Sequence, residues 1–283
     1  MRLGYLGPAG TFSEEALRAS ADLAAAELVP FSSIYDTVMA VQAGAVDRAL
    51  VPIENALEGA VHATLDAIAI EAPEVEIVGE TVLPIRNCLI AQAGIELGEI
   101  QAVVSHPQPL GQCARFLRSE LPGVTVRAAT STAEAVRIVV ESREPWAALG
   151  PRLAADLYGG VVLRDGVDDD PDNATRFVWV ARAGEAGERA SRRVDAAEWK
   201  TSIVFAGAGD RSPGWLVRCL SEFAFRGVNL TKIESRPRRG RLGHYLFLID
   251  LDGHAASRPV EEAIAGLRSH CEEVRVLGTY PAA

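Results

Sequence analysis

Residues 173–177 read Asn-Ala-Thr-Arg-Phe and place a hydroxyl where acid chemistry could occur. If residues 175–180 form a regular strand, Thr175 and Phe177 share one face and Arg176 points to the other, which leaves Arg176 open to a structural role. A threonine hydroxyl is a weak acid in water. In a cleft with little water it can hand over its proton as a leaving group departs, provided that it is positioned and its oxygen is stabilised. We therefore expect Thr175 to act as a general acid.

Further polar runs lie where the sequence pattern changes from strand to helix. Small-molecule sites of α/β proteins gather at such junctions, because the carboxyl ends of parallel strands meet at one edge of the sheet. The runs are Gly7–Ser13, Pro52–Asn55, Ser105–Gln108 and Thr130–Thr132. Together with Thr175 they predict a site for a small organic substrate.

The first and last of these runs offer groups that suit a carboxylate. Ser13 is the expected helix N-cap after a turn rich in glycine, and exposed N–H groups at such a helix start would bind an anion. Ser131 and Glu134 have the spacing of a capping box. An ordinary capped turn remains the alternative interpretation for both runs. The first run is not a dinucleotide-binding fingerprint, since the G-x-G-x-x-G spacing is missing.

The two middle runs place amide side chains at strand ends. Asn55 can both donate and accept, which suits the orientation of a hydroxylated, carboxylated substrate, whereas Glu54 would need a structural partner beside an anion. In the next run Ser105 is a candidate cap and Gln108 a candidate ligand contact, while His106 is expected at the surface or behind the site. The five histidines show neither metal spacing nor a nucleophile triad, so no metal is expected.

Composition limits the classes of protein to consider. The 283 residues exceed a typical single domain, and 48% hydrophobic with 23% charged side chains is usual for a folded globular chain. A net charge of -10 argues against nonspecific binding to nucleic acid or to anionic membranes. The cysteines lack CxxC spacing, so neither a zinc site nor a disulfide framework is expected, and a reducing cytoplasm fits. Secretion and membrane spanning are not expected either, because no leader-like segment and no run of about 18 apolar residues occurs.

Short apolar runs alternate with helical patterns in two blocks, which predicts two α/β lobes with a cleft between them. The blocks begin at strands near 2–6 and 75–79. Residues 80–91 read as an extended crossing between lobes rather than a buried central strand, because Pro84 interrupts them. The acidic loop 168–172 is expected to be a solvated turn, with a metal site as the alternative.

Residues 183–198 have two glycines and mixed charges and read as a linker. This divides the chain into a first domain at 1–182 and a second at 199–283. The second domain follows the order strand, helix, strand, strand, helix, strand, which is the ferredoxin-like βαββαβ arrangement. Many small regulators and enzymes share this arrangement, so it does not establish a function.

Five motifs, in order, resemble those of prephenate dehydratases. They are GPAGTFSEEA at 7–16, VPIEN at 51–55 with Gly59, SHPQPLGQC at 105–113, TSTAEA at 130–135 and NATRF at 173–177. The tail NLTKIESRP at 229–237 is similar to the phenylalanine-sensing ACT domain of bacterial members. The resemblance covers essentially the whole chain. It implies a two-lobed, doubly wound catalytic domain of the periplasmic-binding-protein type, followed by a ferredoxin-like ACT domain.

The resemblance implies a reaction of phenylalanine biosynthesis that needs no cofactor. Prephenate loses carbon dioxide and its ring hydroxyl to give phenylpyruvate. Aromatisation drives this reaction, so the enzyme has only to hold two carboxylates, align the ring and protonate a poor leaving group. The residues that the family pattern places around prephenate are Thr175 as proton donor, Asn55 and Gln108 as orienting amides, Thr11, Ser13, Ser131 and Thr132 at the carboxylates, and Arg176 and Phe177 beside them.

The ACT-like tail implies L-phenylalanine as an effector. It also implies a homodimer or homotetramer, because ACT domains commonly bind their amino acid between two copies. Apolar strands near 203–205 and 245–251 could supply the interface. The implied effector residues are Gly214, Trp215, Leu216, Val217, Asn229, Leu230, Glu234, Ser235, Arg236 and Pro237.

Two positions depart from the family pattern. Ala56 stands where the motif usually has a serine, which removes one hydroxyl near the site and could alter affinity or substrate choice. Trp215 stands where ACT domains usually have alanine. Two interpretations of Trp215 remain open: the indole reshapes the effector pocket, or it packs outward on the first turn of a helix.

Other function classes remain open. Two α/β lobes around a cleft are also typical of solute-binding proteins, in which Thr175 would be superfluous. Arogenate dehydratase acts on a substrate with an amine in place of the keto group, and Ala56 keeps that activity open. A prephenate decarboxylase would have to withhold the proton that Thr175 is placed to give. The product formed from prephenate or arogenate would distinguish these activities.

Overall fold

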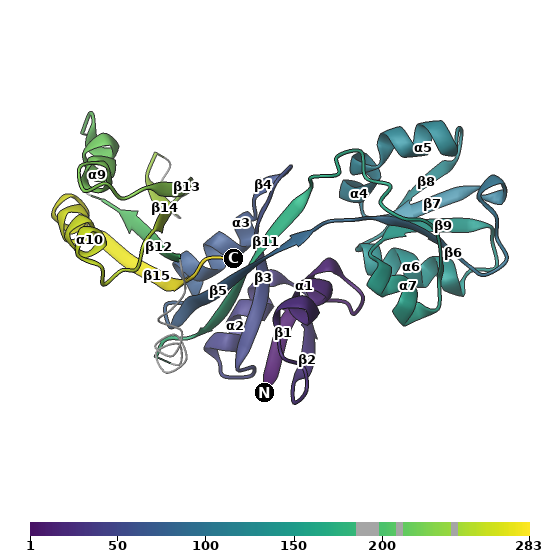
Figure 1. Ribbon diagram of the computed structural model, residues 1–283, viewed down its shortest axis with the longest axis horizontal. Helices are drawn as coiled ribbons and strands as arrows, with labels where there is room; N and C mark the ends of the chain where they lie inside the picture. Colours follow the sequence, from purple (N-terminus) through teal and green to yellow (C-terminus); the bar gives the residue numbers. More distant parts are fainter. Residues whose placement is uncertain (185–197, 208–211, 239–242) are drawn as a thin grey trace. The chain divides into compact units, whose positions relative to one another are not determined.

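The computed structural model describes residues 1–184, 198–207, 212–238 and 243–283 (Figure 1). The predicted linker at 183–198 therefore lies almost entirely outside the described residues. The chain divides into two compact units, and each combines segments that are distant in sequence. The first unit consists of Met1–Thr37, Glu54–Gly59 and Val82–Phe177, and the second of Val38–Ile53, Ala60–Thr81 and Val178–Ala283.

The amino-terminal elements confirm the predicted alternation of strand and helix. β1 (Arg2–Leu6) pairs in parallel with β2 (Glu27–Phe31), and Leu3 and Tyr5 of β1 are buried. The strand order of this first sheet is β2-β1-β3-β11-β5, with β4 paired to β3. Its other strands and its helices are β3 (Arg48–Asn55), β4 (Gly59–Ala60), β5 (Val75–Pro84), β11 (Ala174–Arg182), α1 (Phe12–Ser20), α2 (Ile34–Gln42), α3 (His62–Asp66) and the π-helix η1 (Ala67–Glu71).

The second sheet belongs to the first unit and has helices on both faces (Figure 1). Its strand order is β10-β6-β9-β7-β8, with β7 parallel to β8 and β9. Cys88 and Ile90 of β6 belong to a core with α6 and α7, whereas Leu89 and Ala91 belong to a core with α5. The sheet is therefore the middle layer of three. Its elements are β6 (Cys88–Ala91), η2 (Leu97–Glu99), β7 (Ala102–Ser105), α4 (Pro107–Gln112), α5 (Ala114–Glu120), β8 (Thr125–Ala128), α6 (Thr132–Glu141), β9 (Trp146–Gly150), α7 (Arg152–Tyr158) and β10 (Val161–Arg164).

The prediction that residues 80–91 are only a crossing segment is wrong for its second half. β5 does extend to Pro84, at an edge of the first sheet, as a proline requires. The following run Cys88–Ala91 is a fully buried strand with neighbours on both sides. A strand that is buried on both faces reads as a continuous apolar run, and Pro84 lies outside it.

The prediction of a solvated turn at 168–172 holds for Pro171 and Asp172, which are exposed, but is wrong for Asp168 and Asp169. Asp168 accepts hydrogen bonds of 2.6 Å from both the backbone N and the Nδ2 of the buried Asn87, and burial raises the pKa of Asp168. Asp169 accepts from the backbone N–H of Arg115 at the start of α5. These two carboxylates accept hydrogen bonds from backbone N–H groups that are distant in sequence. Local composition therefore could not predict this role.

The third sheet confirms the predicted βαββαβ order. Its strands are antiparallel in the order β13-β14-β12-β15. Helices α9 and α10 cover one face of this sheet (Figure 1). Phe223 and Leu267 of these helices share a buried core with Phe205 and Ile249 of the sheet. The elements are β12 (Trp199–Ala206), α9 (Trp215–Ala224), β13 (Leu230–Pro237), β14 (Tyr245–Asp252), α10 (Arg258–His270) and β15 (Glu273–Pro281).

The opposite face of the third sheet packs on the segment Ala60–Thr81 of the same unit. Leu248 of β14 and Ile77 of β5 line one small cavity. β15 passes so close to β5 that a Cβ atom on Gly278 would overlap the backbone of Ile77. The third sheet and this segment therefore form one packed body.

Candidate functional site

Thr175 and Asn55 form the centre of the candidate site, in the first unit. Thr175 lies in β11, and Asn55 is the last residue of β3. The Nδ2 of Asn55 donates to the Oγ1 of Thr175 over 2.9 Å, and each residue is only 8% exposed. Because the threonine oxygen accepts this bond, its O–H remains available as a donor. A fixed amide dipole aimed at that oxygen stabilises negative charge as a proton leaves.

Backbone groups and a second amide hold Asn55 in one orientation. Its Oδ1 accepts from the backbone N–H groups of Leu57 and Glu58, each over 3.0 Å. Its Nδ2 also donates to the Oδ1 of Asn173 over 3.0 Å. With its oxygen engaged by two backbone donors, the amide must present its nitrogen to Thr175. The structure therefore places Asn55 behind the hydroxyl.

Two residues that the motifs did not single out join this network. Asn173 is 1% exposed and donates from its Nδ2 to the Oε1 of Gln112 over 3.4 Å. Within the described ranges, the Nε2 of Gln112 is buried and has no hydrogen-bond partner, so a donor is available to a ligand. Gln112 ends α4, whereas the predicted contact Gln108 is exposed on the first turn of that helix. The motif contains both glutamines, and only the fold distinguishes them.

The turn that precedes α1 is organised by a buried carboxylate. Glu14 is 3% exposed and accepts from the backbone N of Gly10 over 2.7 Å. The N-cap of α1 is Thr11, whose Oγ1 accepts from the backbone N of Glu14, so the prediction of Ser13 as the cap is wrong. The first residue of a helix is uncertain by one or two positions when it is predicted from sequence, and here two hydroxyl residues lie close together. Ser13 is buried within the first turn.

The same turn packs on α7. The Oη of Tyr158 donates to the carbonyl oxygen of Ala9 over 2.8 Å. Gly10 has a φ of +84°, and a Cβ there would stand 3.2 Å from the Cα of Ala154. Glycine is required at this position because of both the left-handed backbone and the close approach.

The prediction that Ser131 caps a helix is confirmed. Its Oγ accepts from the backbone N of Glu134 over 3.0 Å at the start of α6, where Thr132 is also buried. The carboxylate of Glu134 does not complete the capping box but pairs with Arg137 over 2.7 Å. The Arg137 hydrogen bond lowers the pKa of Glu134.

The cap of α4 is His106, so the prediction of Ser105 in that role is wrong. The Nδ1 of His106 accepts from the backbone N of Gln108 over 3.3 Å. Ser105 is fully buried at the end of β7 and donates to the carbonyl oxygen of Leu149 over 2.7 Å. Its hydroxyl joins two neighbouring strands, which depends on the strand order and not on local spacing.

The other two residues of the Asn-Ala-Thr-Arg-Phe run have different surroundings. Arg176 forms a 3.2 Å ion pair with Glu54, and the side chain of Arg176 is 12% exposed. Phe177 is 2% exposed in β11. Glu54 thus has a cationic structural partner, as expected from the sequence.

A pocket of about 370 Å³ lies in the second unit at the start of α9. It contains all four predicted effector residues at 214–217, together with Tyr245 and Phe247 of β14. None of the predicted residues at 229–237 lines it. Instead, Asn229 donates to Asp252 over 2.8 Å, Leu230 packs against the core, Ser235 and Pro237 are exposed, and Glu234 and Arg236 contact α3.

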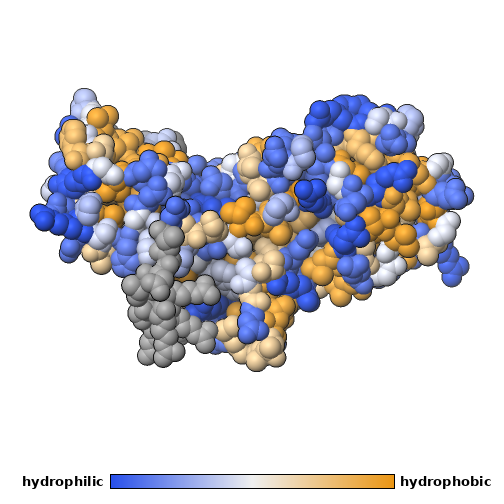
Figure 2. All heavy atoms as spheres, in the orientation of Figure 1, coloured by the Kyte–Doolittle hydropathy of each residue, from blue (hydrophilic) through white to orange (hydrophobic). Residues whose placement is uncertain are grey.

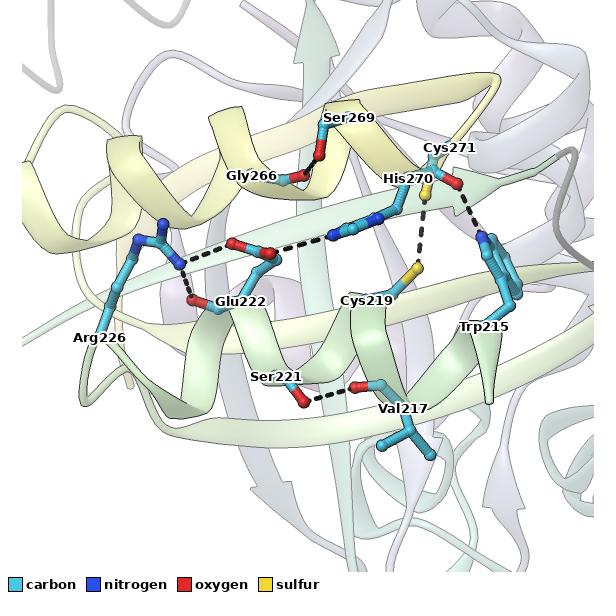
Figure 3. Close-up of polar contacts among 10 residues, drawn as sticks. All are labelled: Trp215, Val217, Cys219, Ser221, Glu222, Arg226, Gly266, Ser269, His270 and Cys271. Atoms are coloured by element: carbon cyan, nitrogen blue, oxygen red, sulfur yellow. Dashed lines mark hydrogen bonds and ion pairs between the residues drawn. The ribbon is translucent and has the colours of Figure 1, made fainter. Parts of the chain in front are cut away.

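Trp215 packs inward, so the interpretation that it points outward is wrong. The residue is 6% exposed, and its Nε1 donates to the carbonyl oxygen of His270 over 2.7 Å (Figure 3). Its ring lies 6.1 Å from that of Phe205 and 5.9 Å from that of Phe247, measured between centroids. The local sequence does not show which way a side chain on the first turn of a helix points, because that depends on where the sheet lies.

The described part of the chain also permits some general statements. Its cysteines are free thiols. No three His, Cys, Asp or Glu side chains in it lie close enough to bind a metal ion. No helix in it is both long and apolar enough to cross a membrane.

Comparison with known proteins adds an independent observation. The family model for prephenate dehydratase matches residues 3–185. The chain is 39% identical to a prephenate dehydratase of Amycolatopsis methanolica, covering 99% of this chain and 88% of that protein. A solved prephenate dehydratase of Arthrobacter aurescens, in complex with L-Phe, is 39% identical with a TM-score of 0.89 over 99% of this chain and 90% of that one. A structure described as a novel type of quorum quenching acylase is 27% identical with a TM-score of 0.84, covering 100% and 98%.

Proposed function

The chain belongs to the prephenate dehydratase family of lyases, and we propose that the Asn55–Thr175 pair is the place where prephenate loses its ring hydroxyl. The 2.9 Å bond from the Asn55 amide to the Thr175 oxygen carries this proposal. It leaves the threonine proton free to be given away, and it stabilises the oxygen that remains.

The proposed reaction balances with one threonine and solvent. The bond between the ring and its carboxylate breaks, carbon dioxide leaves, and the electron pair enters the ring. As this pair moves through the ring, the bond from the ring to its hydroxyl breaks and Thr175 gives its proton to the departing oxygen, so water and phenylpyruvate form. Thr175 recovers a proton from solvent, and each turnover therefore consumes one proton. Aromatisation supplies the driving force, and the protein supplies position and electrostatic support.

Neutral donors around the site are proposed to hold the substrate. The buried Nε2 of Gln112 is an unused donor at one end of the amide network and suits a carboxylate or keto oxygen. We assign Gln112 this orienting role in addition to Gln108. The hydroxyls and N–H groups at Thr11, Ser13, Ser131 and Thr132 are proposed to bind carboxylates, with the buried starts of α1 and α6 as their supports.

The third sheet and its helices are proposed to form an ACT regulatory domain at residues 199–283, separate from a catalytic domain at 1–182. The pocket at 214–217 is its proposed site for L-phenylalanine, an assignment supported by the L-Phe complex of the Arthrobacter relative. Figure 2 shows apolar side chains gathered over the region of α9, and Val217 and Tyr245 are 67% and 43% exposed. An exposed apolar patch beside the pocket supports a homodimer or homotetramer, and we propose a cytoplasmic location.

Arogenate is a second candidate substrate because of one position. Ala56 is exposed, and its backbone N donates to the carbonyl oxygen of Ala174, the residue before Thr175. A missing hydroxyl at this point would change the contacts of a group near the acid.

The decisive experiment is to identify the product. The purified chain is incubated with prephenate and, separately, with arogenate, and the products are separated by chromatography. Phenylpyruvate from prephenate is expected. Phenylalanine from arogenate alone would assign the second candidate, and a non-aromatic product would show that Thr175 does not deliver its proton. Recovery of both substrates unchanged would overturn the proposal in favour of a binding protein.

A further inference from the structure

The loop 165–173 between β10 and β11 contacts the helix that carries Gln112. The backbone N of Asp169 donates to the carbonyl oxygen of Gln112, the last residue of α4, over 2.7 Å. The carboxylate of Asp169 accepts from the backbone N of Arg115, at 3.0 Å to each of its oxygens, and from that of Phe116 over 3.4 Å. Backbone groups at helix ends lack partners within the helix, and Asp169 satisfies such groups at the end of α4 and at the start of α5.

The bend between these two helices sets the direction of Gln112. Only Cys113 separates α4 from α5, and its φ of -113° and ψ of 18° depart from helical values. Helix α4 has six residues, and an isolated helix of this length is unstable in water, so contacts from elsewhere must hold it. The direction of its last side chain therefore depends on what is bound at the bend, which is Asp169.

The preceding residue, Asp168, fixes the same loop on its other side. Its carboxylate accepts from the backbone N and the Nδ2 of Asn87, each over 2.6 Å, and the backbone N of Val167 donates to the carbonyl oxygen of Asn87 over 2.9 Å. Within the residues that the structure describes, the Oδ1 of the fully buried Asn87 has no hydrogen-bond partner. The amide turns its nitrogen to the carboxylate although this leaves its own oxygen unsatisfied, so Asp168 determines its orientation. The loop is thus fixed to residues 85–87, between β5 and β6, as well as to α4 and α5.

Four residues after Asp169, the loop also reaches the side chain of Gln112. The carbonyl oxygen of Asn173 accepts from the backbone N of Ile85 over 2.8 Å, and its Nδ2 donates to the Oε1 of Gln112 over 3.4 Å. The loop therefore contacts both oxygens of Gln112, the backbone one through Asp169 and the side-chain one through Asn173. The buried Nε2 is the part of the amide left for a ligand. All of these residues belong to the first unit, as the proposed acid does.

We propose that Asp169 is a positioning residue for the dehydratase site. By holding the bend between α4 and α5, it directs the Nε2 of Gln112 toward the substrate, and Asp168 fixes the loop that carries it. Asp169 acts through Gln112 and is not a ligand, because its carboxylate oxygens are engaged by the N–H groups at the start of α5. This inference rests on the proposed function and on the role that it assigns to Gln112.

The test is a double-mutant cycle on the full chain, with the rate of phenylpyruvate formation as the readout. Gln112→Ala is expected to lower kcat/KM by about 10–100-fold, the usual loss for a hydrogen bond to a charged group. Asp169→Ala is expected to lower it about tenfold, because a misdirected amide donates poorly. The double variant is expected to match Gln112→Ala within about twofold, since Asp169 then has no amide to position.

The split between KM and kcat separates positioning from a general disturbance of the fold. Because Gln112 is assigned to substrate binding, the loss in Asp169→Ala is expected mainly in KM, with kcat changed less than about threefold. A disturbed fold would also displace Asn55 from Thr175 and lower kcat.

Two further variants in the same loop serve as controls. Asp172→Ala removes an exposed carboxylate and is expected to change neither kcat nor KM. Asp169→Asn keeps an acceptor oxygen for the backbone N of Arg115, so it should retain more kcat/KM than Asp169→Ala. It also replaces the alanine variant in the cycle if that variant does not fold.

Several results would overturn the inference while the unmodified chain converts prephenate. They are an unchanged kcat/KM in folded Asp169→Ala or in Gln112→Ala, a double variant about tenfold below Gln112→Ala, and a fall in kcat without a rise in KM. Failure of the unmodified chain to convert prephenate would instead overturn the proposed function, and the inference with it.

Discussion

The polar network at Thr175 and the one along β13 are built from different groups. Thr175, Asn55 and Asn173 are uncharged and at most 8% exposed. Arg236 and Asp66 are charged, and their side chains are 20% and 26% exposed, respectively. A neutral, buried network fixes geometry without the cost of desolvating ions, and it does not compete with the charges of a dianionic substrate.

The two networks differ in how they respond to solvent. Partly exposed ion pairs contribute modest energy and weaken as salt is added, so a small perturbation can change them. Buried amide contacts respond little to salt. We therefore expect added salt to weaken the Arg236–Asp66 pair and to leave the effect of variants at Thr175 unchanged.

The largest effect is expected from removing the acid. Thr175→Ala is expected to fold normally and to lower kcat by about 10²–10⁴-fold, the usual contribution of a general acid. Thr175→Ser retains the hydroxyl and should keep more activity than the alanine variant. Initial rates of phenylpyruvate formation at low and high salt give the measurement. Near-normal turnover by Thr175→Ala would contradict the assignment.

The next effect concerns the stability of the third sheet. Trp215→Ala removes a buried indole and its hydrogen bond to His270, and about 3–5 kcal/mol of the free energy of unfolding should be lost. Trp215→Phe keeps a ring and should lose less. Denaturant titration gives the stability, and the inhibition curve with phenylalanine reports the pocket. We expect the curve to shift in both variants; curves identical to the unmodified chain would separate Trp215 from effector sensing.

Removing the donor behind the hydroxyl should have an intermediate effect. Asn55→Asp keeps an oxygen for the backbone N–H groups of Leu57 and Glu58 but loses the donor to Thr175. By analogy with the loss of one oxyanion donor, kcat should fall about 10²-fold with little change in KM. Asn229→Ala, which removes an exposed amide contact, is the matched control. Equal rates for the two variants would remove Asn55 from the mechanism.

The smallest effect is a pH dependence of stability at the α9–α10 contact. His270 lies 3.0 Å from Glu222, which also pairs with Arg226 (Figure 3). The hydrogen bond from His270, followed by that from Arg226, lowers the pKa of Glu222 below its ordinary 4.5. The pairs therefore stabilise the fold above pH 4.5, and this contribution is lost as pH falls through the lowered pKa. Glu222→Gln should reduce the acid dependence of the unfolding midpoint between pH 5 and 3; an unaltered dependence would show that other carboxylates dominate.

Several site features were readable from residue types alone. Hydrophobic alternation places Thr175 and Phe177 on one face of β11, and both are buried. The hydroxyl at Ser131 predicts a helix start, and α6 begins one residue later. These features depend on neighbours within a few residues, so local sequence carries them.

Other features needed the fold. Ser13 and Thr11 are both candidate caps by type, and Thr11 is the cap because its hydroxyl accepts from the backbone N of Glu14 and donates to the carbonyl oxygen of Leu6. Gln112 and Gln108 share one motif, yet Gln112 is the one that reaches Asn173, because the last residue of α4 lies beside the start of β11. The alternation of charged residues along β13 is visible, but Asp66, the partner of Arg236, is 170 residues away.

The sequence by itself determined the alternation of strands and helices at the amino end, the βαββαβ order of the third sheet, the family, and the identity of the hydroxyl that we assign as the acid. Only the tertiary structure decided which groups meet it. The Asn55–Thr175 bond joins residues 120 positions apart, and the direction of Trp215 depends on the sheet beneath it. The physical reason is range: backbone preference and side-chain periodicity act over a few residues, whereas hydrogen bonds between strands and helices are selected by the packing of the whole chain.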